Sequence, residues 1–491
     1  MSDDVGLVDR PFPRPSSGIR WAIAGSIGWA LLSAWLVHGH PPCVDLPAHA
    51  AQIQTLAALM RGDAAVAAVY RWRFQLGYGL VDWLGLPLAL LWNGAVAARM
   101  LLWVALVLHP VAWAAVLRAL GRPLGVLPCL LPLSFGISYW YGFLPFYFTE
   151  PLLFLGLALF LRTLTRPTVA GIAAVNALAC VVAEGHLLLF GVLLALAGCA
   201  ILARRTTARS AAEAAACFIA PLALASPRIG TLLSRVVSPG GAPATEYAAM
   251  SHLNWFFKNY RPEGRLVALF PLVTTAIFFL VWALRRGWRT RSPFAIFAGM
   301  AALYALAPKT LSGVCLVSVR LPALVAAFAA FLVEWPTVPA WLRRSLIALA
   351  ALSLGETALF HWRFERALDG LGEMTAAASG RADGYFSTAG DRILGSKHLY
   401  LEHLGGWVTG TRGGIGQNFF ADADQQPVAQ RVPGVPPSDL SHATPAELAL
   451  FDTILVFGPP PFPAAFAGWR TIGSAGAWTL IGRPTGPGAG R

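Results

Sequence analysis

The sequence predicts an all-α polytopic membrane protein with about 11 transmembrane helices and a small α/β extracytoplasmic domain at its C-terminal end. Three observations lead to this fold class. Of the 491 residues, 56% are hydrophobic and only 12% are charged, and the mean hydropathy is +0.60. The apolar residues form runs long enough to cross a bilayer, and arginines gather between these runs. Strand-like segments appear only after the last apolar run.

The net charge of +13 does not indicate binding to nucleic acid. The Lys and Arg residues lie in short clusters between apolar runs, as the positive-inside rule expects, and not on one face. All cysteines except Cys43 fall within or against apolar runs, so no disulfide framework is predicted. The expected surroundings are therefore membrane lipids.

The first 18 residues are polar and contain several prolines, so residues 1–18 are predicted to be a disordered cytoplasmic N-terminus. The first span is Ile19–Val37. It is too long for the apolar part of a signal peptide, and no small-residue cleavage site follows it. We therefore expect it to remain as an anchor at the start of a transmembrane domain over residues 19–360.

Residues 38–96 are predicted to form the first external loop. Asp45 lies where a helix N-cap belongs and Pro47 suits a first turn, so Ala48–Met60 should form a helix at the membrane surface. Residues 76–93 are apolar but short, and they are broken by Gly and Pro. They predict a half-inserted or juxtamembrane helix, because a true span would need more residues.

The remaining spans follow from the apolar runs. They are Ala97–Leu117, Pro123–Ser138, a fourth that ends at Arg162, a fifth from Val169 to Glu184, a sixth that ends at Arg204, Ala211–Ser226, Leu266–Leu284, Phe294–Ala307, Val314–Val333 and one from Arg344 to Phe360. An aromatic run, Ser138–Phe148, is typical of the membrane interface, and residues 227–264 form a second external loop. With a cytoplasmic N-terminus, every arginine cluster that ends a span lies inside.

An odd number of spans places the C-terminal part of the chain outside the membrane on the extracytoplasmic side. Residues 361–483 are richer in Gly and Pro and contain two strand-like runs, Thr453–Phe457 and Trp478–Ile481. A helical stretch is expected near Pro445–Leu450. These features predict a small α/β domain, followed by a disordered tail at 484–491.

Asp45 is the first candidate for chemistry. A carboxylate that is partly desolvated near a bilayer edge has a raised pKa, which suits a general base that takes a proton from an acceptor hydroxyl. The alternative is a simple helix cap. His40, Cys43, Asp45 and His49 also include the residue types that bind zinc, but their spacing matches no standard site. No cofactor is therefore predicted, and a divalent metal is the alternative.

Arg320 is the second candidate. An arginine just inside the outer end of a span is costly unless it is paired. It is expected to bind the phosphate of a lipid-linked substrate bidentately, with contact to lipid headgroups as the alternative. Lys309 and Arg228 are further candidates for the same role, or simple loop charges.

Three acidic or basic residues and one aromatic residue complete the candidate set. Glu184 and His186 indicate a functional site if they lie at membrane depth, whereas a tight surface turn would leave them solvated. Glu150 is expected to line a cavity or to face water. Tyr141 is a candidate for stacking on a sugar ring or a polyprenyl chain, or else belongs to an interfacial aromatic belt.

The order of these parts resembles the GT-C superfamily of integral-membrane glycosyltransferases. The motif Asp45-Leu-Pro-Ala-His49 looks like the acidic first-loop motif of its bacterial members, and Tyr139–Phe148 and Arg320 look similar to features of such proteins. The likeness in architecture covers most of the chain, and the likeness in sequence is confined to these stretches. Well-studied members carry paired acidic residues in the first loop, whereas Val44 precedes Asp45 here.

The resemblance implies a multi-pass enzyme of the bacterial inner membrane that serves the cell envelope. It would transfer a sugar from a polyprenyl-phosphate donor to a lipid or glycan acceptor on the extracytoplasmic face, with inversion. Asp45 would deprotonate the acceptor, Arg320 with Lys309 would neutralise the leaving phosphate, and His49 would help to bind substrate. The alternatives are a transporter or flippase for lipid-linked or polymeric envelope substrates, and a non-catalytic envelope-assembly protein.

Overall fold

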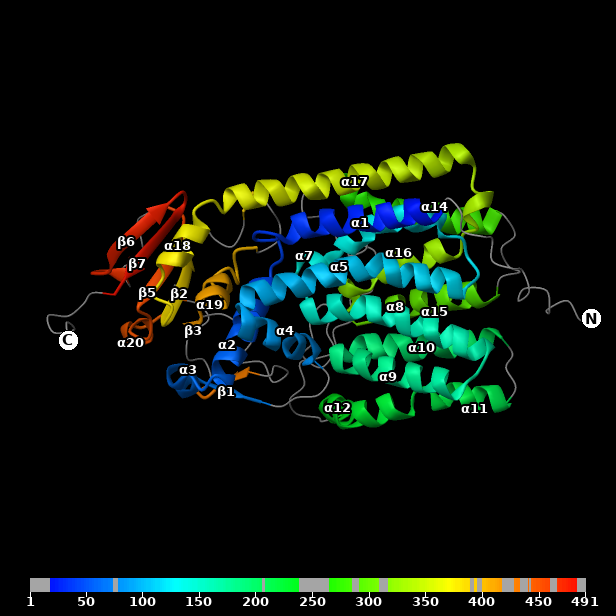
Figure 1. The fold of residues 1–491 in the computed structure, drawn as a ribbon, viewed down its shortest axis with the longest axis horizontal. Coiled ribbons are helices and arrows are strands. Elements are labelled where there is room, and N and C mark those ends of the chain that lie inside the picture. The colour runs from blue at the N-terminus through cyan, green and yellow to red at the C-terminus, as the bar shows by residue number, and fades with distance from the viewer. Residues whose placement is uncertain are drawn as a thin grey trace, which may run out of the picture.

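The structure is a computed structural model. The described residues are 18–73, 78–204, 208–237, 265–284, 291–308, 317–388, 393–394, 400–416, 428–432, 440, 443–459 and 466–483. Most of the helices lie roughly parallel along the long axis of the molecule, and a small sheet lies at one end (Figure 1).

Three described helices are long and apolar enough to cross a bilayer: α5 (Gly94–Ala119), α8 (Leu144–Thr165) and α17 (Ala340–Ala367). Shorter helices pack beside them. These are α1 (Gly18–Val37), α4 (Leu80–Leu91), α9 (Val169–Gly185), α10 (Leu187–Ala203), α14 (Arg265–Leu284), α15 (Arg291–Leu306) and α16 (Pro322–Phe331). The chain is therefore a polytopic helical membrane protein, as predicted, while the number of spans stays a prediction.

Two predicted spans are not single continuous helices in the structure. Pro123–Ser138 is not one helix but a series of short turns: η1 (Leu124–Val126), α6 (Leu127–Leu130), η2 (Leu131–Phe135) and α7 (Ile137–Trp140). Pro128 and Pro132 account for the breaks, since proline lacks the amide hydrogen that a continuous helix needs. Helices α11 (Ala208–Ala216) and α12 (Ile219–Val237) replace the predicted span Ala211–Ser226 and carry the chain into the predicted second loop.

Helix α2 (Leu46–Met60) begins where the sequence predicts, but it is not exposed at a surface. All of its residues from Leu46 to Ala58 are buried. It packs between α5 and α4 on one side and α19 (Gly406–Arg412) of the C-terminal part on the other. The sequence gives no sign of this cover, because α19 comes from the far end of the chain.

The C-terminal part contains a five-stranded sheet in the order β3-β2-β5-β7-β6. Its strands are β2 (Ala382–Ser387), β3 (Ile415–Gly416), β5 (Thr453–Phe457), β6 (Arg470–Ala475) and β7 (Trp478–Gly482). Strand β2 runs parallel to β3 and β5, and β7 is antiparallel to β5 and β6. Helices α18 (Leu371–Ala377) and α20 (Pro445–Leu448) accompany it, so the predicted strands at 453–457 and 478–481 and the predicted short helix are confirmed.

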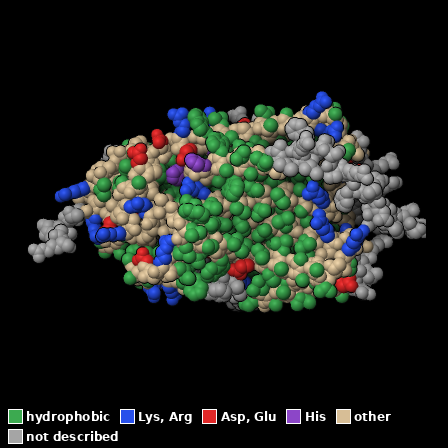
Figure 2. Space-filling view, viewed as in Figure 1, with side chains coloured by type: hydrophobic (Ala, Val, Ile, Leu, Met, Phe, Trp, Pro, Cys, Tyr) green, Lys and Arg blue, Asp and Glu red, His purple; other side chains and the backbone are tan. Residues whose placement is uncertain are grey.

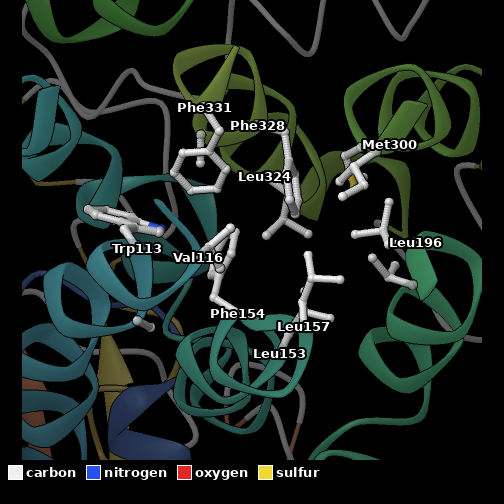
Figure 3. Close-up of a cluster of buried hydrophobic side chains, with 14 of the residues drawn as sticks. Trp113, Val116, Leu153, Phe154, Leu157, Leu196, Met300, Leu324, Phe328 and Phe331 are labelled. Carbon is white, nitrogen blue, oxygen red and sulfur yellow. The ribbon is translucent and has the colours of Figure 1, made fainter. Parts of the chain in front are cut away.

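Two hydrophobic clusters hold the molecule together. In the first, Figure 3 shows Trp113, Phe154, Leu196, Met300 and Phe328 meeting between α5, α8, α10, α15 and α16. The second runs from the helices into the C-terminal part: it joins residues of α1, α2, α5 and α17 to residues of α19, β5 and β7. The C-terminal part is thus packed onto the helices through a shared core.

A second connection is a two-stranded sheet between β1 (Tyr70–Trp72), in the first loop, and β4 (Val428–Gln430). The Tyr70 hydroxyl donates to the Gly416 carbonyl at 2.6 Å, and the Arg431 amide donates to the Val69 carbonyl at 2.8 Å. On the outside, hydrophobic side chains form a broad band over the helices, while Lys and Arg gather at the end opposite the sheet and on the sheet part (Figure 2). Such a band is what lipid contact requires.

Candidate active site

Asp45 lies at the start of α2, but its side chain does not cap the helix. The backbone around it is fixed by the aromatic run: the Asp45 amide donates to the Tyr141 carbonyl at 2.8 Å, and the Val44 amide donates to the Trp140 carbonyl at 3.0 Å. Because these bonds hold the loop, the carboxylate is free to point toward another partner. The simple cap interpretation is therefore wrong for the Asp45 side chain.

That partner is His403, in the turn before α19. The His403 Nε2 atom lies 3.4 Å from the Asp45 Oδ1 atom, and the two side chains are 12% and 15% exposed. Both side chains are therefore largely shielded from water. The pair joins the two ends of the chain in one site.

The protonation of Asp45 reflects this setting. Burial raises the pKa of Asp45 to about 6, whereas the positive charges of His403 and Arg320 lower it and the nearby Glu402 carboxylate raises it. At neutral pH the residue is mostly ionised and yet far more basic than an exposed carboxylate. This is the balance that a general base needs.

His49 lies one turn after Asp45 on α2, and its amide donates to the Asp45 carbonyl at 3.1 Å. Burial lowers the pKa of His49 to about 3, and the charges of His403 and Arg320 lower it further. His49 is therefore neutral under all ordinary conditions. It can donate or accept a hydrogen bond in the site, but it does not add charge.

Arg320 lies in a short 3-10 turn, η4 (Ser318–Arg320), just before α16, and not within a regular helix as predicted. Its guanidinium group lies 3.9 Å from the centre of the Phe143 ring and 5.7 Å from that of Phe146. The Arg320 Nη1 atom donates to His186 Nε2 at 3.2 Å. The ring faces and the neutral imidazole hold the guanidinium in place.

His186 lies between α9 and α10 and is 1% exposed. Burial lowers the pKa of His186 well below its usual value, and the charge of Arg320 lowers it further, so the ring is neutral. Since Nε2 accepts from Arg320, Nδ1 carries the hydrogen. No partner for Nδ1 is present among the residues that the structure describes.

A second arginine approaches from α12. The ring of Tyr78 lies 4.7 Å from that of His186. Burial raises the pKa of Tyr78, while the charges of Arg320 and Arg228 lower it, so both arginines lie near this phenol. Arg228 lies within α12 and not in a loop, so the alternative of a simple loop charge does not hold, while its role in substrate binding stays a prediction.

Glu184 lies at the end of α9, in the helical hairpin that α9 and α10 form around His186, and close to the start of α4. A Cβ atom built on Gly79, beside Tyr78, would lie 3.1 Å from the Glu184 Oε1 atom. Tyr141 lies on the other side of the site, where its ring stacks on Phe143 at 5.2 Å. Burial raises the pKa of Tyr141, and so do the negative charges of Asp45 and Glu402. Tyr141 therefore links the Asp45 half of the site to the Arg320 half.

Two predicted site residues do not belong to this cluster as described. Glu150 is buried within the helices, and its Oε2 atom lies 3.7 Å from His109 Nε2, so it does not face water. Lys309 lies outside the described residues. In the described part of the chain, no group of three or more His, Cys, Asp or Glu side chains is placed to hold a metal ion.

Sequence reasoning missed four residues of the site: Tyr78, Phe143, Glu402 and His403. Phe143 lies in the aromatic run, so its neighbourhood was identified but its contact with a guanidinium was not. Tyr78 lies at the start of an apolar stretch. For His403 the only signal was an acidic–histidine pair followed by two glycines, Gly405 and Gly406, in an otherwise ordinary domain.

The comparisons with known proteins show the fold. No family model matches the sequence, and no curated protein is similar to it. The structure of ArnT from Cupriavidus metallidurans in the apo state is similar with a TM-score of 0.54 and 12% identity, over 95% of this chain and 98% of that one. A structure of the same enzyme bound to undecaprenyl phosphate is similar with a TM-score of 0.48 and 14% identity, over the same shares of both chains.

The arabinofuranosyltransferase AftD from Mycobacteria is similar with a TM-score of 0.50 and 12% identity. The match covers 95% of this chain but 40% of AftD, so it is confined to less than half of the larger protein. The chain therefore has the fold of the GT-C membrane glycosyltransferases, as the sequence analysis expected. At this level of identity the likeness concerns the fold alone.

Proposed function

We propose that the protein is a membrane glycosyltransferase that moves a sugar from a polyprenyl-phosphate donor to a hydroxyl acceptor at the extracytoplasmic face of the inner membrane. The observation that carries the proposal is the placement of a basic carboxylate near an arginine guanidinium. Arg320 is close enough to Asp45 to lower its pKa, yet the two do not form an ion pair, since Asp45 faces His403 and Arg320 faces His186. A base and an anion site side by side suit group transfer from a phosphate.

In the proposed reaction, Asp45 removes the proton from the acceptor hydroxyl as its oxygen attacks the anomeric carbon. The bond between that carbon and the phosphate oxygen breaks, and the lipid phosphate leaves with both electrons. The configuration inverts because the acceptor enters opposite the leaving group. Arg320 stabilises the negative charge that develops on the phosphate, and the proton leaves Asp45 for water.

The phosphate end of the site is supported by two further groups. His186 Nδ1 is a buried donor with no acceptor in the described protein, and a phosphate oxygen is the kind of atom that would satisfy it. Arg228 adds a second positive charge near Tyr78. Such a set favours a phosphate monoanion or dianion over a neutral ligand.

The sugar and its acceptor would lie between these two ends. Tyr141, which feels the charge of Asp45 and stacks on Phe143, offers an aromatic surface there. Aromatic faces pack against the apolar faces of sugar rings. His49 offers a neutral hydrogen-bonding group on the side of α2. No metal ion is needed for this scheme, and a divalent ion stays an alternative.

The test uses the full-length protein in detergent micelles, incubated with polyprenyl-phosphate donors that carry radiolabelled pentoses or hexoses. Release of free polyprenyl phosphate and transfer of label to added envelope lipids or glycans are both measured. We expect release with at least one donor, and loss of more than about 100-fold in Asp45→Asn. Arg366→Met serves as a control, because that arginine lies over an exposed tryptophan of α17, with its guanidinium carbon 5.0 Å from the ring centre.

A transporter would move the intact lipid without breaking the sugar–phosphate bond. Movement of donor across proteoliposomes with no release of polyprenyl phosphate would therefore refute the enzyme and favour the flippase. Unchanged activity in Asp45→Asn would remove this carboxylate from the mechanism.

A further inference from the structure

The Asp45–His403 pair joins two parts of the chain that sequence alone keeps apart. Asp45 begins α2 in the first loop, and His403 precedes α19 in the C-terminal part. We infer that His403 is a positioning residue for the base Asp45, so that the C-terminal domain supplies part of the active site. This inference rests on the proposed function and adds a residue and a domain to it.

The docking of α19 on α2 is what brings the two side chains together. A Cβ atom on Gly406 would collide with the Pro47 carbonyl, and one on Gly410 would lie 2.9 Å from the Ala50 side chain. The two glycines, four residues apart, lie on one face of α19 and let its backbone approach the first turns of α2. Larger residues at these positions would hold the helices further apart.

This close approach fixes His403 as well. The Gly406 amide donates to the His403 carbonyl at 2.8 Å, so the histidine backbone belongs to the turn that leads into α19. The histidine is therefore carried by the same rigid contact that seats α19 on α2. Its Nε2 atom then lies on the Asp45 carboxylate while the Asp45 backbone is held by Tyr141.

The consequence is chemical as well as geometric. A carboxylate that is buried this deeply would stay protonated without positive neighbours and would be useless as a base. His403 faces one carboxylate oxygen and leaves the other for an acceptor hydroxyl. The charged and titratable groups around Asp45 are His403 and Glu402 from the C-terminal domain, Arg320 from η4, Tyr141 and Cys43 from the neighbouring loops, and His49 on α2.

The test measures the midpoint of Asp45 protonation in two ways. The first is the acidic limb of the pH profile of kcat/KM for the donor. The second needs no substrate: carbodiimide labelling of Asp45 between pH 4 and 8, followed by peptide mass spectrometry. In the wild-type protein both midpoints are expected at about 6. The variants are His403→Gln and His403→Lys, and the control is His40→Gln.

We expect His403→Gln to move both midpoints upward by about one pH unit and, because less of Asp45 is then ionised, to lower kcat at pH 7 by about 2-fold, with KM for the donor unchanged. His403→Lys should restore the lower midpoint because it restores a cation. His40 is the control, since its Nδ1 atom pairs with Glu365 Oε1 at 3.2 Å in the same first loop and its charge is not among those that shift the pKa of Asp45. Its replacement should leave both midpoints unchanged.

Unchanged midpoints in His403→Gln would overturn the inference, as would an equal shift in His40→Gln. Failure of the proposed function has a different signature. In that case no donor releases polyprenyl phosphate, while the labelling midpoint of Asp45 still depends on His403.

Discussion

At the scale of single residues, the site depends on two charges that are kept from neutralising each other. Asp45 is directed to His403, and Arg320 is held between the Phe143 ring and the neutral His186. A direct ion pair between Asp45 and Arg320 would quench both the base and the phosphate site. Tyr141 of the aromatic run, which feels the charge of Asp45, stacks on Phe143, and Phe143 carries the Arg320 guanidinium over its ring.

The first residue-scale prediction concerns stability. Burial raises the pKa of Asp45 from 3.8 to about 6, so above pH 6 its ionisation disfavours the folded state by roughly 3 kcal/mol. The penalty disappears as the pH falls below about 4, where the carboxyl is protonated in both states. Asp45→Asn should therefore raise the unfolding temperature at pH 8 and have little effect at pH 4.

This is measured by thermal unfolding of the purified protein in detergent at both pH values. Asp369→Asn, at an exposed position after α17, is the control and should change neither temperature. A lower unfolding temperature for Asp45→Asn at pH 8 would mean that the carboxylate stabilises the fold and is not held at a cost.

The second residue-scale prediction concerns Arg320. Arg320→Lys keeps the charge but loses the planar contact with Phe143 and the fixed donor pattern, so kcat/KM for the donor should fall about 10-fold. Arg320→Met removes the charge as well and should cost about 100-fold or more. Steady-state kinetics with varied donor checks this, and an equal effect of both changes would mean that charge is not what the residue supplies.

At the scale of elements, helix α2 is the centre of the arrangement. It is buried between α4, α5 and α19, and it carries Asp45 at its start and His49 one turn later. Close backbone approaches set its position on both sides: a Cβ atom on Gly94, at the start of α5, would collide with the Ala50 carbonyl, as one on Gly406 would with Pro47. Two buried hydrogen bonds add to these contacts: the Gln52 side chain donates to Asp82 Oδ1 of α4 at 2.8 Å, and the Gly94 amide donates to Gln54 Oε1 at 2.8 Å.

The element-scale prediction is that Gly406→Ala displaces α19 from α2 and so moves His403 away from Asp45. We expect a loss of about 10-fold in kcat and an unfolding free energy lower by about 1–3 kcal/mol. Gly372→Ala is the matched control in α18 of the same domain, because a Cβ atom there meets nothing within 4 Å. Equal behaviour of the two variants would show that the close contact is not needed.

At the scale of the whole molecule, the sheet and the helices α2 and α19 beside the candidate site lie at one end (Figure 1), and Lys and Arg gather at the opposite end as well as on the sheet part (Figure 2). Helix α17 runs the full length between them and leads directly into α18 and β2. A single bilayer around the apolar band would therefore separate the active site from the arginine clusters.

The topology prediction follows from this difference between the two ends of the molecule. A cysteine at Ile472, which is 53% exposed on β6, should react with a membrane-impermeant maleimide in intact spheroplasts. A cysteine at Trp341, which is 68% exposed at the other end of α17, should react only after permeabilisation. Both are introduced into a background without native cysteines. The reverse pattern would place the C-terminal domain in the cytoplasm and contradict an extracytoplasmic active site.

The sequence alone determined the membrane class, the positions of most long helices and two strands of the C-terminal sheet. It also singled out Asp45, His49, His186 and Arg320. These features are local: the transfer of a 20-residue apolar run into lipid, the periodicity of a strand and the cost of a charge near a bilayer are properties of short stretches.

Only the tertiary structure decided that α2 is buried, that Arg228 lies on a helix beside Tyr78, and that His403 faces Asp45. Each of these depends on contacts between segments far apart in the chain. Whether a carboxylate caps its own helix or meets a histidine from another domain is set by how closely two backbones approach, here through Gly406 and Gly410. That distance is a property of the packed molecule, and no single stretch of sequence contains it.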